Sequence, residues 1–249
     1  MSALREDAFL GGKLRIQQPV QGYRAGADPV LLAASVPAKR GDSVLELGCG
    51  VGTGMLCLMA RIGNLSLTGL ERDPIMARIA AQNVAANGFD AEIIQGDIAA
   101  LPPPLKERGF DHVFFNPPFF DRGTGSASPN PAREAGRGDD AVSTWCDTAL
   151  RRLRPGGTLS LIQRTERLPD ILAALAKRVG DCRVLPLQPR EGRACKLFIL
   201  QCRKGAKGPF SLLSPMVLHK GTHHEADEDS YTPDASQVLR HGAATLLAH

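Results

Sequence analysis

A glycine-rich turn directly after a short apolar run constrains the fold of this chain more than any other feature. The run Ser43–Leu47 reads as a buried strand, glycines follow at Gly48, Gly50 and Gly52, and a helix is predicted over Gly54–Arg61. Glycine adopts positive φ values and has no Cβ, so the strand can turn tightly and the backbone can approach a ligand closely. The free N–H groups at the start of the helix favour an anionic group. The pattern predicts a nucleotide-like ligand at the carboxyl end of a strand.

Short apolar runs alternate with helix-like stretches along the middle of the chain, which is typical of parallel strands joined by crossover helices. We predict an α/β, Rossmann-like fold with a seven-stranded, mostly parallel sheet and helices on both faces. The strands are expected at 43–47, 65–70, 91–95, 111–115, 158–163, 183–187 and 196–201. The connecting helices are expected at 54–61, 74–87, 141–153 and 168–179. Asp73 before Pro74 has the sequence of a helix N-cap.

The 249 residues suit one α/β domain with small extensions. We expect an N-terminal extension at 1–42 that borders the ligand site, a core at 43–204 and a C-terminal extension at 205–249, with a terminal helix over 235–247. No apolar run is long enough to span a membrane, and the first residues lack the apolar segment of a signal peptide. A cytoplasmic location is therefore predicted.

Acidic residues at the strand ends narrow the choice of ligand. Glu46 closes the first strand, and Glu71 ends the second, where a carboxylate can accept hydrogen bonds from both ribose hydroxyls. Asp97 follows the third strand and is placed to accept an adenine amino group, with Ile98 covering the base; taken singly, Asp97 reads equally well as a helix cap. Dinucleotide enzymes share this logic, but their G-x-G-x-x-G spacing needs a third glycine where this chain has Thr53. Glu71 by itself does not show whether the ligand is NAD or S-adenosylmethionine.

The sequence Asn116-Pro117-Pro118-Phe119-Phe120 follows the fourth strand, on the same edge as the glycines. An amine conjugated to a ring or a carbonyl is a poor nucleophile because its lone pair is delocalised. The Asn116 side-chain oxygen and the Pro117 carbonyl can each accept one N–H of such an amine and so localise the lone pair. Phe119 is expected to stack on a planar substrate, whereas Phe120 reads equally as a substrate contact or a core residue. The motif predicts methylation of a planar amine.

The charge of the chain favours a polyanionic partner. The net charge is +4 and the isoelectric point is near 8.8, which is mildly basic. Basic residues before the core, after the Asn-Pro-Pro-Phe motif and late in the chain are expected to converge around one cleft. The late residues are Arg203, Lys204, Lys207 and Lys220. We predict Arg122, Arg133 and Lys220 as contacts to nucleic acid.

The polar stretch 123–140 is predicted to be a long loop, read either as a substrate lid or as an inert insertion. No metal is expected, because the six cysteines include no C-x-x-C pair. His219, His223 and His224 lie in a polar segment read as a solvated loop.

With these motifs in order, the chain resembles the Asn-Pro-Pro-Tyr/Phe class of S-adenosylmethionine-dependent methyltransferases, and specifically the bacterial tRNA (adenine-N6) methyltransferases that act on valine tRNA. The resemblance covers nearly the whole chain, including the segment 21–33, 217–221 and 231–234. It implies the class I methyltransferase fold, S-adenosylmethionine as cofactor and tRNA as partner. By resemblance, cofactor binding passes to Gly48, Gly50, Gly52 and Glu71, and the positioning of the target amine to Asn116 through Phe119. Together with the residues placed above, the predicted cofactor-binding set is Asp28, Glu46, Gly48, Gly50, Gly52, Glu71, Arg72, Asp97, Ile98 and Asn116, and the predicted catalytic set is Asn116, Pro117, Pro118 and Phe119.

Three alternatives remain at this point. An rRNA guanine-N2 methyltransferase uses similar chemistry. A protein-glutamine N5 methyltransferase also acts on a planar amide, although such enzymes usually carry an N-terminal helical domain for which the residues before Val44 leave too little room. A non-catalytic module that binds RNA or nucleotides is the third alternative, and the intact Glu46, Glu71, Asp97 and Asn116 argue against it.

Overall fold

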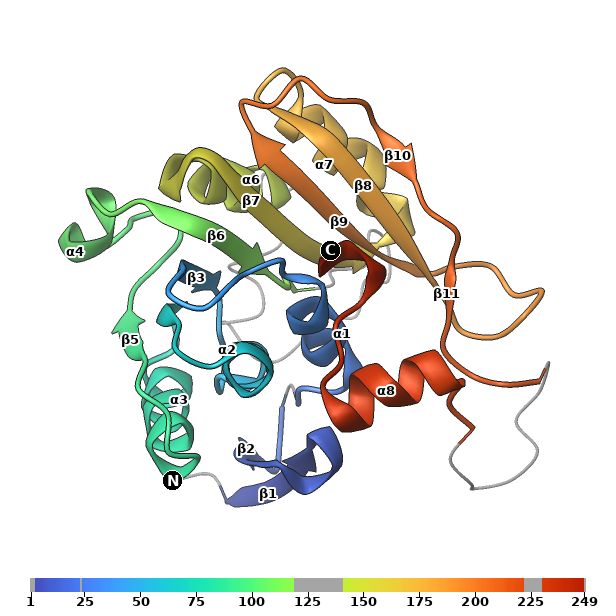
Figure 1. Cartoon of the computed structure of the whole chain (residues 1–249). Coiled ribbons are helices and arrows are strands. Elements are labelled where there is room, and N and C mark those ends of the chain that lie inside the picture. Colours follow the sequence, from blue (N-terminus) through green and yellow to red (C-terminus); the bar gives the residue numbers. More distant parts are fainter. Residues whose placement is uncertain (1–2, 23, 119–140, 222–229, 249) are drawn as a thin grey trace, which may run out of the picture.

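The computed structural model describes residues 3–22, 24–118, 141–221 and 230–248. These residues form a nine-stranded sheet flanked by helices, and a separate two-stranded hairpin (Figure 1). The sheet has the order β10-β8-β9-β7-β6-β3-β4-β5, and β11 pairs with β8. Its strands are β3 (Ser43–Leu47), β4 (Ser66–Glu71), β5 (Glu92–Gln95), β6 (Phe110–Phe115), β7 (Leu153–Arg164), β8 (Val179–Gln188), β9 (Leu197–Lys204), β10 (Ser211–Leu212) and β11 (Met216–Val217).

Every neighbouring pair of strands in this sheet is parallel except the pairs made by β9, which is antiparallel to both β7 and β8. The predicted α/β fold with a mostly parallel sheet is confirmed, and its seven strands correspond to β3–β9. The sheet has nine strands rather than seven because two strands of two residues each, β10 and β11, add to its β8 side. We call the side where β3–β8 end the carboxyl edge; the residues that directly follow these strands are Gly48, Arg72, Gly96, Asn116, Thr165 and Pro189.

Helices cover both faces of the sheet because successive strand residues point to opposite sides. On one face, α1 (Ala27–Ser35), α2 (Thr53–Ile62), α3 (Pro74–Ala86) and α8 (Pro233–His241) pack around Val44 and Phe114. On the other face, α4 (Pro103–Lys106), α6 (Ala141–Arg152) and α7 (Leu168–Leu175) pack around Leu45 and Phe115. Helices on both faces, as predicted, hold the strand ends of the carboxyl edge in fixed register.

The N-terminal extension contains a hairpin, β1 (Leu4–Phe9) and β2 (Leu14–Pro19), joined by a 3-10 turn at Leu10–Gly12, that the sequence analysis did not predict. Two asparagines, Asn83 on α3 and Asn87 directly after its last residue, bind the backbone of β2. The Asn83 side chain accepts from Gln17 N at 2.9 Å and donates to Gln17 O at 3.0 Å and Val51 O at 2.9 Å. Asn87 binds the N–H and carbonyl of Arg15 at 3.0 and 2.8 Å. Asn83 thereby connects the hairpin to the glycine turn.

Two predicted helices were too long. The helix expected over 235–247 ends at His241, because Gly242 adopts a left-handed conformation with φ 74° and ends the helix; a 3-10 turn follows at Leu246–Ala248. The helix expected over 168–179 ends at Leu175; Lys177 has φ 63° and Val179 already begins β8. The positive φ of Gly242 sets the first boundary, and the second is set by Ala176, whose ψ of 140° leaves the helical region directly after Leu175.

The predicted N-cap at Asp73 is confirmed and yields a stability prediction. Its Oδ1 accepts hydrogen bonds from Ile75 N at 2.7 Å and Met76 N at 3.2 Å. Because these donors have no partner within the helix, Asp73→Ala is expected to lower the free energy of unfolding by about 1 kcal/mol. Asp73→Asn keeps the accepting oxygen and should lose much less. Denaturant unfolding of both variants measures the difference, and equal losses would show that charge rather than capping stabilises α3.

Candidate active site

The candidate site is assembled from strand ends that are neighbours in the sheet. Leu47 of β3 lies opposite Leu70 of β4 on one side and Phe115 of β6 on the other. Glu71 of β4 in turn lies opposite Gln95 of β5. The glycine turn, Glu71, the turn after β5 and the Asn116 turn therefore stand next to one another along the carboxyl edge, which is where ligands bind in open α/β sheets.

The glycine turn is packed against the protein at two positions and open at a third. Gly48, Gly50 and Gly52 all adopt left-handed conformations, with φ of 65°, 56° and 87°, where a side chain would be strained. A Cβ on Gly48 would lie 2.5 Å from the Trp145 ring of α6, and one on Gly52 would lie 3.5 Å from Ala80 of α3. A Cβ on Gly50 would meet nothing within 4 Å. The backbone at Gly50 is therefore the part of the turn that a ligand can approach.

Two carboxylates hold this turn in place. Glu46 is buried, and its Oε2 accepts from Met55 N at 2.8 Å, so it ties β3 to the first turn of α2. Burial raises the pKa of Glu46 well above its usual value, the Met55 N–H opposes that rise, and the nearby Glu71 charge adds to it. Glu71 is half-buried, and its two oxygens accept from Gly50 N and Asp73 N, each at 2.8 Å. Each Glu71 oxygen keeps a second lone pair with which to accept a ribose hydroxyl.

The Asp97 side chain makes two contacts in the turn after β5. Its Oδ1 accepts from Ala99 N at 2.8 Å, and its Oδ2 lies 3.8 Å from the exposed guanidinium of Arg72. Asp97 caps no helix, because a bend follows it and α4 begins only at Pro103. Ile98 is half-buried and packs on the core cluster under α6, where its carbonyl accepts from Thr148 Oγ1 at 3.0 Å. This fixed backbone holds Asp97 and Ile98 at the carboxyl edge, and their contact with adenine stays a prediction.

Asp28 belongs to the first turn of α1, and α1 packs on α2 directly behind the glycine turn. Burial raises the pKa of its carboxyl above the usual value. The structure connects Asp28 to the glycine turn only through the packing of α1 on α2. The contact between Asp28 and the cofactor therefore stays a prediction.

The Asn-Pro-Pro turn presents two acceptors beside the glycine turn. Asn116 is half-buried, Pro117 is buried and Pro118 is exposed. The Pro117 carbonyl receives a hydrogen bond of 3.5 Å from Nε2 of Gln163, the penultimate residue of the neighbouring strand β7. Gln163 is only 3% exposed, and its Oε1 accepts from Arg164 N at 2.8 Å. The sequence analysis missed Gln163 because a single glutamine in an apolar strand has no motif, and only the pairing of β6 with β7 brings it to Pro117.

We expect Gln163→Met to slow methyl transfer severalfold without weakening cofactor binding. Methionine keeps the length of the side chain but cannot donate to the Pro117 carbonyl, and one neutral hydrogen bond contributes about 1 kcal/mol. Gln201→Met is the matched control: Gln201 is also buried and donates to a carbonyl, that of Ser35 at 2.9 Å, but away from the carboxyl edge. Steady-state kinetics of both variants measure the difference. If the role of Gln163 were purely structural, Gln163→Met and Gln201→Met would have the same kcat.

Four predicted site residues, Phe119, Phe120, Arg122 and Arg133, lie outside the described residues, as does the predicted loop at 123–140. Lys220 is described and exposed. The predicted convergence of late basic residues was wrong for Arg203, Lys204 and Lys207. Arg203 pairs with Thr158 and Gly180, near the starts of strands that run toward the carboxyl edge, so these three residues lie at the opposite edge.

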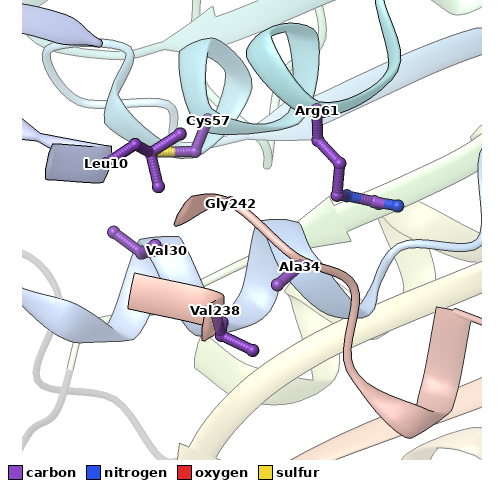
Figure 2. Close-up of a pocket in the computed structure, with 7 residues that line it drawn as sticks. All are labelled: Leu10, Val30, Ala34, Cys57, Arg61, Val238 and Gly242. Atoms are coloured by element: carbon purple, nitrogen blue, oxygen red, sulfur yellow. The ribbon is translucent and has the colours of Figure 1, made fainter. Parts of the chain in front are cut away.

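A small pocket lies on the α1 and α2 face, and none of its lining residues is a predicted site residue (Figure 2). It is lined by Leu10, Val30, Ala34, Cys57, Arg61, Val238 and Gly242. Arg61 donates to the carbonyls of Ala33 and Val36 at the end of α1, and burial lowers its pKa to about 10.

Among the described residues, no group of His, Cys, Asp or Glu side chains is arranged to hold a metal ion. No helix in the same residues is long and apolar enough to cross a membrane.

The fold and the site define a class I S-adenosylmethionine-dependent methyltransferase. The structure is similar to a protein from Agrobacterium tumefaciens described as a predicted O-methyltransferase, with a TM-score of 0.72 and 24% identity over 88% of this chain and 98% of that one. It is also similar to a protein from Listeria monocytogenes described as a putative class I S-adenosylmethionine-dependent methyltransferase, with a TM-score of 0.51 and 17% identity over 74% of this chain and 61% of that one. The chain belongs to the methyltransferase small domain family, whose model matches residues 26–189. It is therefore an enzyme, a methyltransferase with S-adenosylmethionine as its cofactor.

Two curated relatives match most of the chain. One, from Actinobacillus succinogenes, is 30% identical over 81% of this chain and 85% of its own length. Another, from Porphyromonas gingivalis, is 28% identical over 89% of this chain and 91% of its own length. Both are named tRNA1(Val) (adenine(37)-N6)-methyltransferase.

Proposed function

We propose that this enzyme transfers a methyl group from S-adenosylmethionine to N6 of an adenosine in tRNA, with valine tRNA as the first candidate. The observation that carries the proposal is the position of Asn116 and Pro117 directly beside the glycine turn, since β6 and β3 are parallel neighbours in register. The names of the two relatives support adenine in tRNA as the target. The reaction would take place in the cytoplasm, where tRNA is found.

In this proposal, the residues divide into a cofactor set and an amine set. Bound S-adenosylmethionine supplies an electrophilic methyl group. Gly50 offers open backbone to it, Glu71 offers acceptors for its ribose, and Asp97 and Ile98 stand one strand further along for its adenine. Asp28, Glu46, Gly48, Gly52 and Arg72 complete the proposed set, with Glu46 acting through the turn that it holds.

The amine set acts on the target nitrogen. The Asn116 side-chain oxygen and the Pro117 carbonyl each accept one N–H, which draws the lone pair out of conjugation with the ring. The nitrogen then forms its bond to the methyl carbon as the bond from sulfur to that carbon breaks, and one proton leaves the nitrogen. Phe119 is proposed to stack on the base. Because Gln163 already holds the Pro117 carbonyl before substrate arrives, this acceptor needs little reorganisation during the reaction.

In the same proposal, the chain consists of a methyltransferase core at 43–204 between an N-terminal extension at 1–42 and a C-terminal extension at 205–249. The β1–β2 hairpin is bound to α3 through Asn83 and Asn87. In the C-terminal extension, β11 pairs with β8, and α8 packs on α1 and on the 3-10 turn of the hairpin. Both extensions would border the reaction: the first the cofactor, the second the RNA.

Methyl transfer to unmodified tRNA, followed by nucleoside analysis, tests the proposed function. We expect N6-methyladenosine in valine tRNA and none with a tRNA whose target adenosine is replaced by guanosine. Formation of N2-methylguanosine, or methylation of a protein glutamine in place of RNA, would overturn the proposal.

A further inference from the structure

A group of basic residues lies at the carboxyl edge beyond the Asn-Pro-Pro turn. We call it the basic end and define it as Arg190, Arg193, Lys196 and Lys220. Because β8 is parallel to β6 and β7, it also ends at the carboxyl edge, and the connection 189–196 to β9 begins there. In Figure 1 this connection lies at the same end of the sheet as β11 and the segment that follows it.

Backbone and side-chain contacts hold the basic end in place. The Lys196 carbonyl accepts from Thr165 N at 3.0 Å, directly after β7. The Arg193 carbonyl accepts from Gln188 Nε2 at 2.9 Å, and the Arg190 guanidinium donates to the Lys220 carbonyl. These contacts fix the backbone of the basic end against the ends of β7 and β8, which belong to the same sheet as the strands of the candidate site.

The basic end is close to the reacting position. The strand order places β6, β7, β9 and β8 side by side, so the connection is about three strand spacings from the Asn-Pro-Pro turn, or roughly 15 Å. Gln163 and Arg164 at the end of β7 bridge this interval. An extended polyanion with one residue at Asn116 would reach the basic end without crossing the body of the enzyme.

The charges of the basic end favour such a polyanion. Arg193, Lys196 and Lys220 are exposed, and their side chains form no ion pair with any residue in the described part of the chain. Glu191 is the one acidic residue within 189–196. The acidic neighbours on the β7 side are already engaged, because Glu166 lies 3.4 Å from Arg164. Asp170 likewise lies 3.5 Å from Arg167.

We propose that the basic end binds the phosphodiester backbone of the substrate RNA next to the target base, with Arg193, Lys196 and Lys220 as the phosphate contacts. This inference rests on the proposed function, which supplies RNA as the substrate. Phosphate contacts position a nucleic acid without reading its sequence. The basic end therefore fixes where the RNA lies, and the Asn-Pro-Pro turn acts on the base that this position presents.

A charge-reversal pair with a matched control tests the proposal. The test variant is Arg193→Glu with Lys196→Glu. The control is Lys177→Glu with Lys207→Glu, which makes the same charge change with exposed residues at the other ends of the same two strands. Binding of unmodified valine tRNA is measured by fluorescence anisotropy at several KCl concentrations, and S-adenosylmethionine binding is measured by calorimetry.

We expect the test variant to bind tRNA about tenfold more weakly and the control to change less than twofold, because loss of a phosphate contact also loses counterion release. Arg193→Gln with Lys196→Gln should reduce the slope of log K against log [salt] by about one to two. Cofactor affinity and kcat at saturating tRNA should be unchanged in all variants. If test and control variants bind tRNA equally well and still form N6-methyladenosine, the proposed RNA contact at the basic end is wrong, but the proposed function stands. A wild-type enzyme that neither binds nor methylates tRNA would overturn the proposed function, and this inference with it.

Discussion

Asn116→Ala is expected to reduce methyl transfer by about two to three orders of magnitude while leaving the affinity for S-adenosylmethionine within twofold of the wild type. The side-chain oxygen of Asn116 is one of the two proposed acceptors for the target amine, and removal of one hydrogen-bonding group that stabilises a transition state costs about 3 kcal/mol. Cofactor binding should survive, because the glycine turn is held by its hydrogen bonds to Glu71 and Asn83 and not by the Asn116 side chain.

Single-turnover kinetics with tRNA, together with calorimetry for the cofactor, measure the two effects separately. Asn116→Asp is the matched variant, since aspartate keeps an acceptor oxygen at the same position and should retain more activity than alanine. A parallel loss of activity and cofactor affinity in Asn116→Ala would contradict the division between an amine set and a cofactor set.

The features that the sequence predicted correctly are those in which the conformation of a residue depends on neighbours only a few positions away in the chain. The alternation of apolar runs and helices gave β3–β9, and the Asp73-Pro74 pair gave the start of α3. The glycines were placed correctly because a strand that turns directly into a helix needs positive φ values at those positions. Local backbone requirements of this kind leave a clear mark on the sequence.

The features that sequence missed depend on partners far along the chain. Gln163 meets Pro117 only because β7 pairs with β6, and Asn83 meets Gln17 only because the N-terminal hairpin folds onto α3. The basic residues were misassigned for the same reason. Lys196 directly precedes β9 and Arg203 lies near its end, so one antiparallel strand separates them to opposite edges of the sheet. Composition gives the number of positive charges, whereas strand direction decides which of them can meet the substrate.

Glu71→Ala is expected to weaken S-adenosylmethionine binding by about 100-fold and to destabilise the enzyme even without cofactor. A carboxylate that accepts hydrogen bonds contributes about 1.5–3 kcal/mol per bond, and the variant loses the proposed ribose contacts. It also leaves Gly50 N and Asp73 N without their acceptor, so the turn that faces the cofactor loses its anchor. Thermal unfolding with and without S-adenosylmethionine measures both effects.

Asp97→Ala is the control for Glu71→Ala, because it removes an equal charge from the neighbouring strand end. The Asp97 carboxylate is 39% exposed and its ion pair with Arg72 spans 3.8 Å, so solvent screens much of its interaction and the loss of affinity should be nearer tenfold. Glu71→Gln should fall between the two, since the amide keeps one accepting oxygen for either Gly50 N or Asp73 N but not for both. If Glu71→Ala lowers thermal stability while S-adenosylmethionine still raises the melting temperature as much as in the wild type, Glu71 holds the turn but does not bind the ribose. The cofactor would then be held mainly by the open backbone at Gly50 and by the turn after β5.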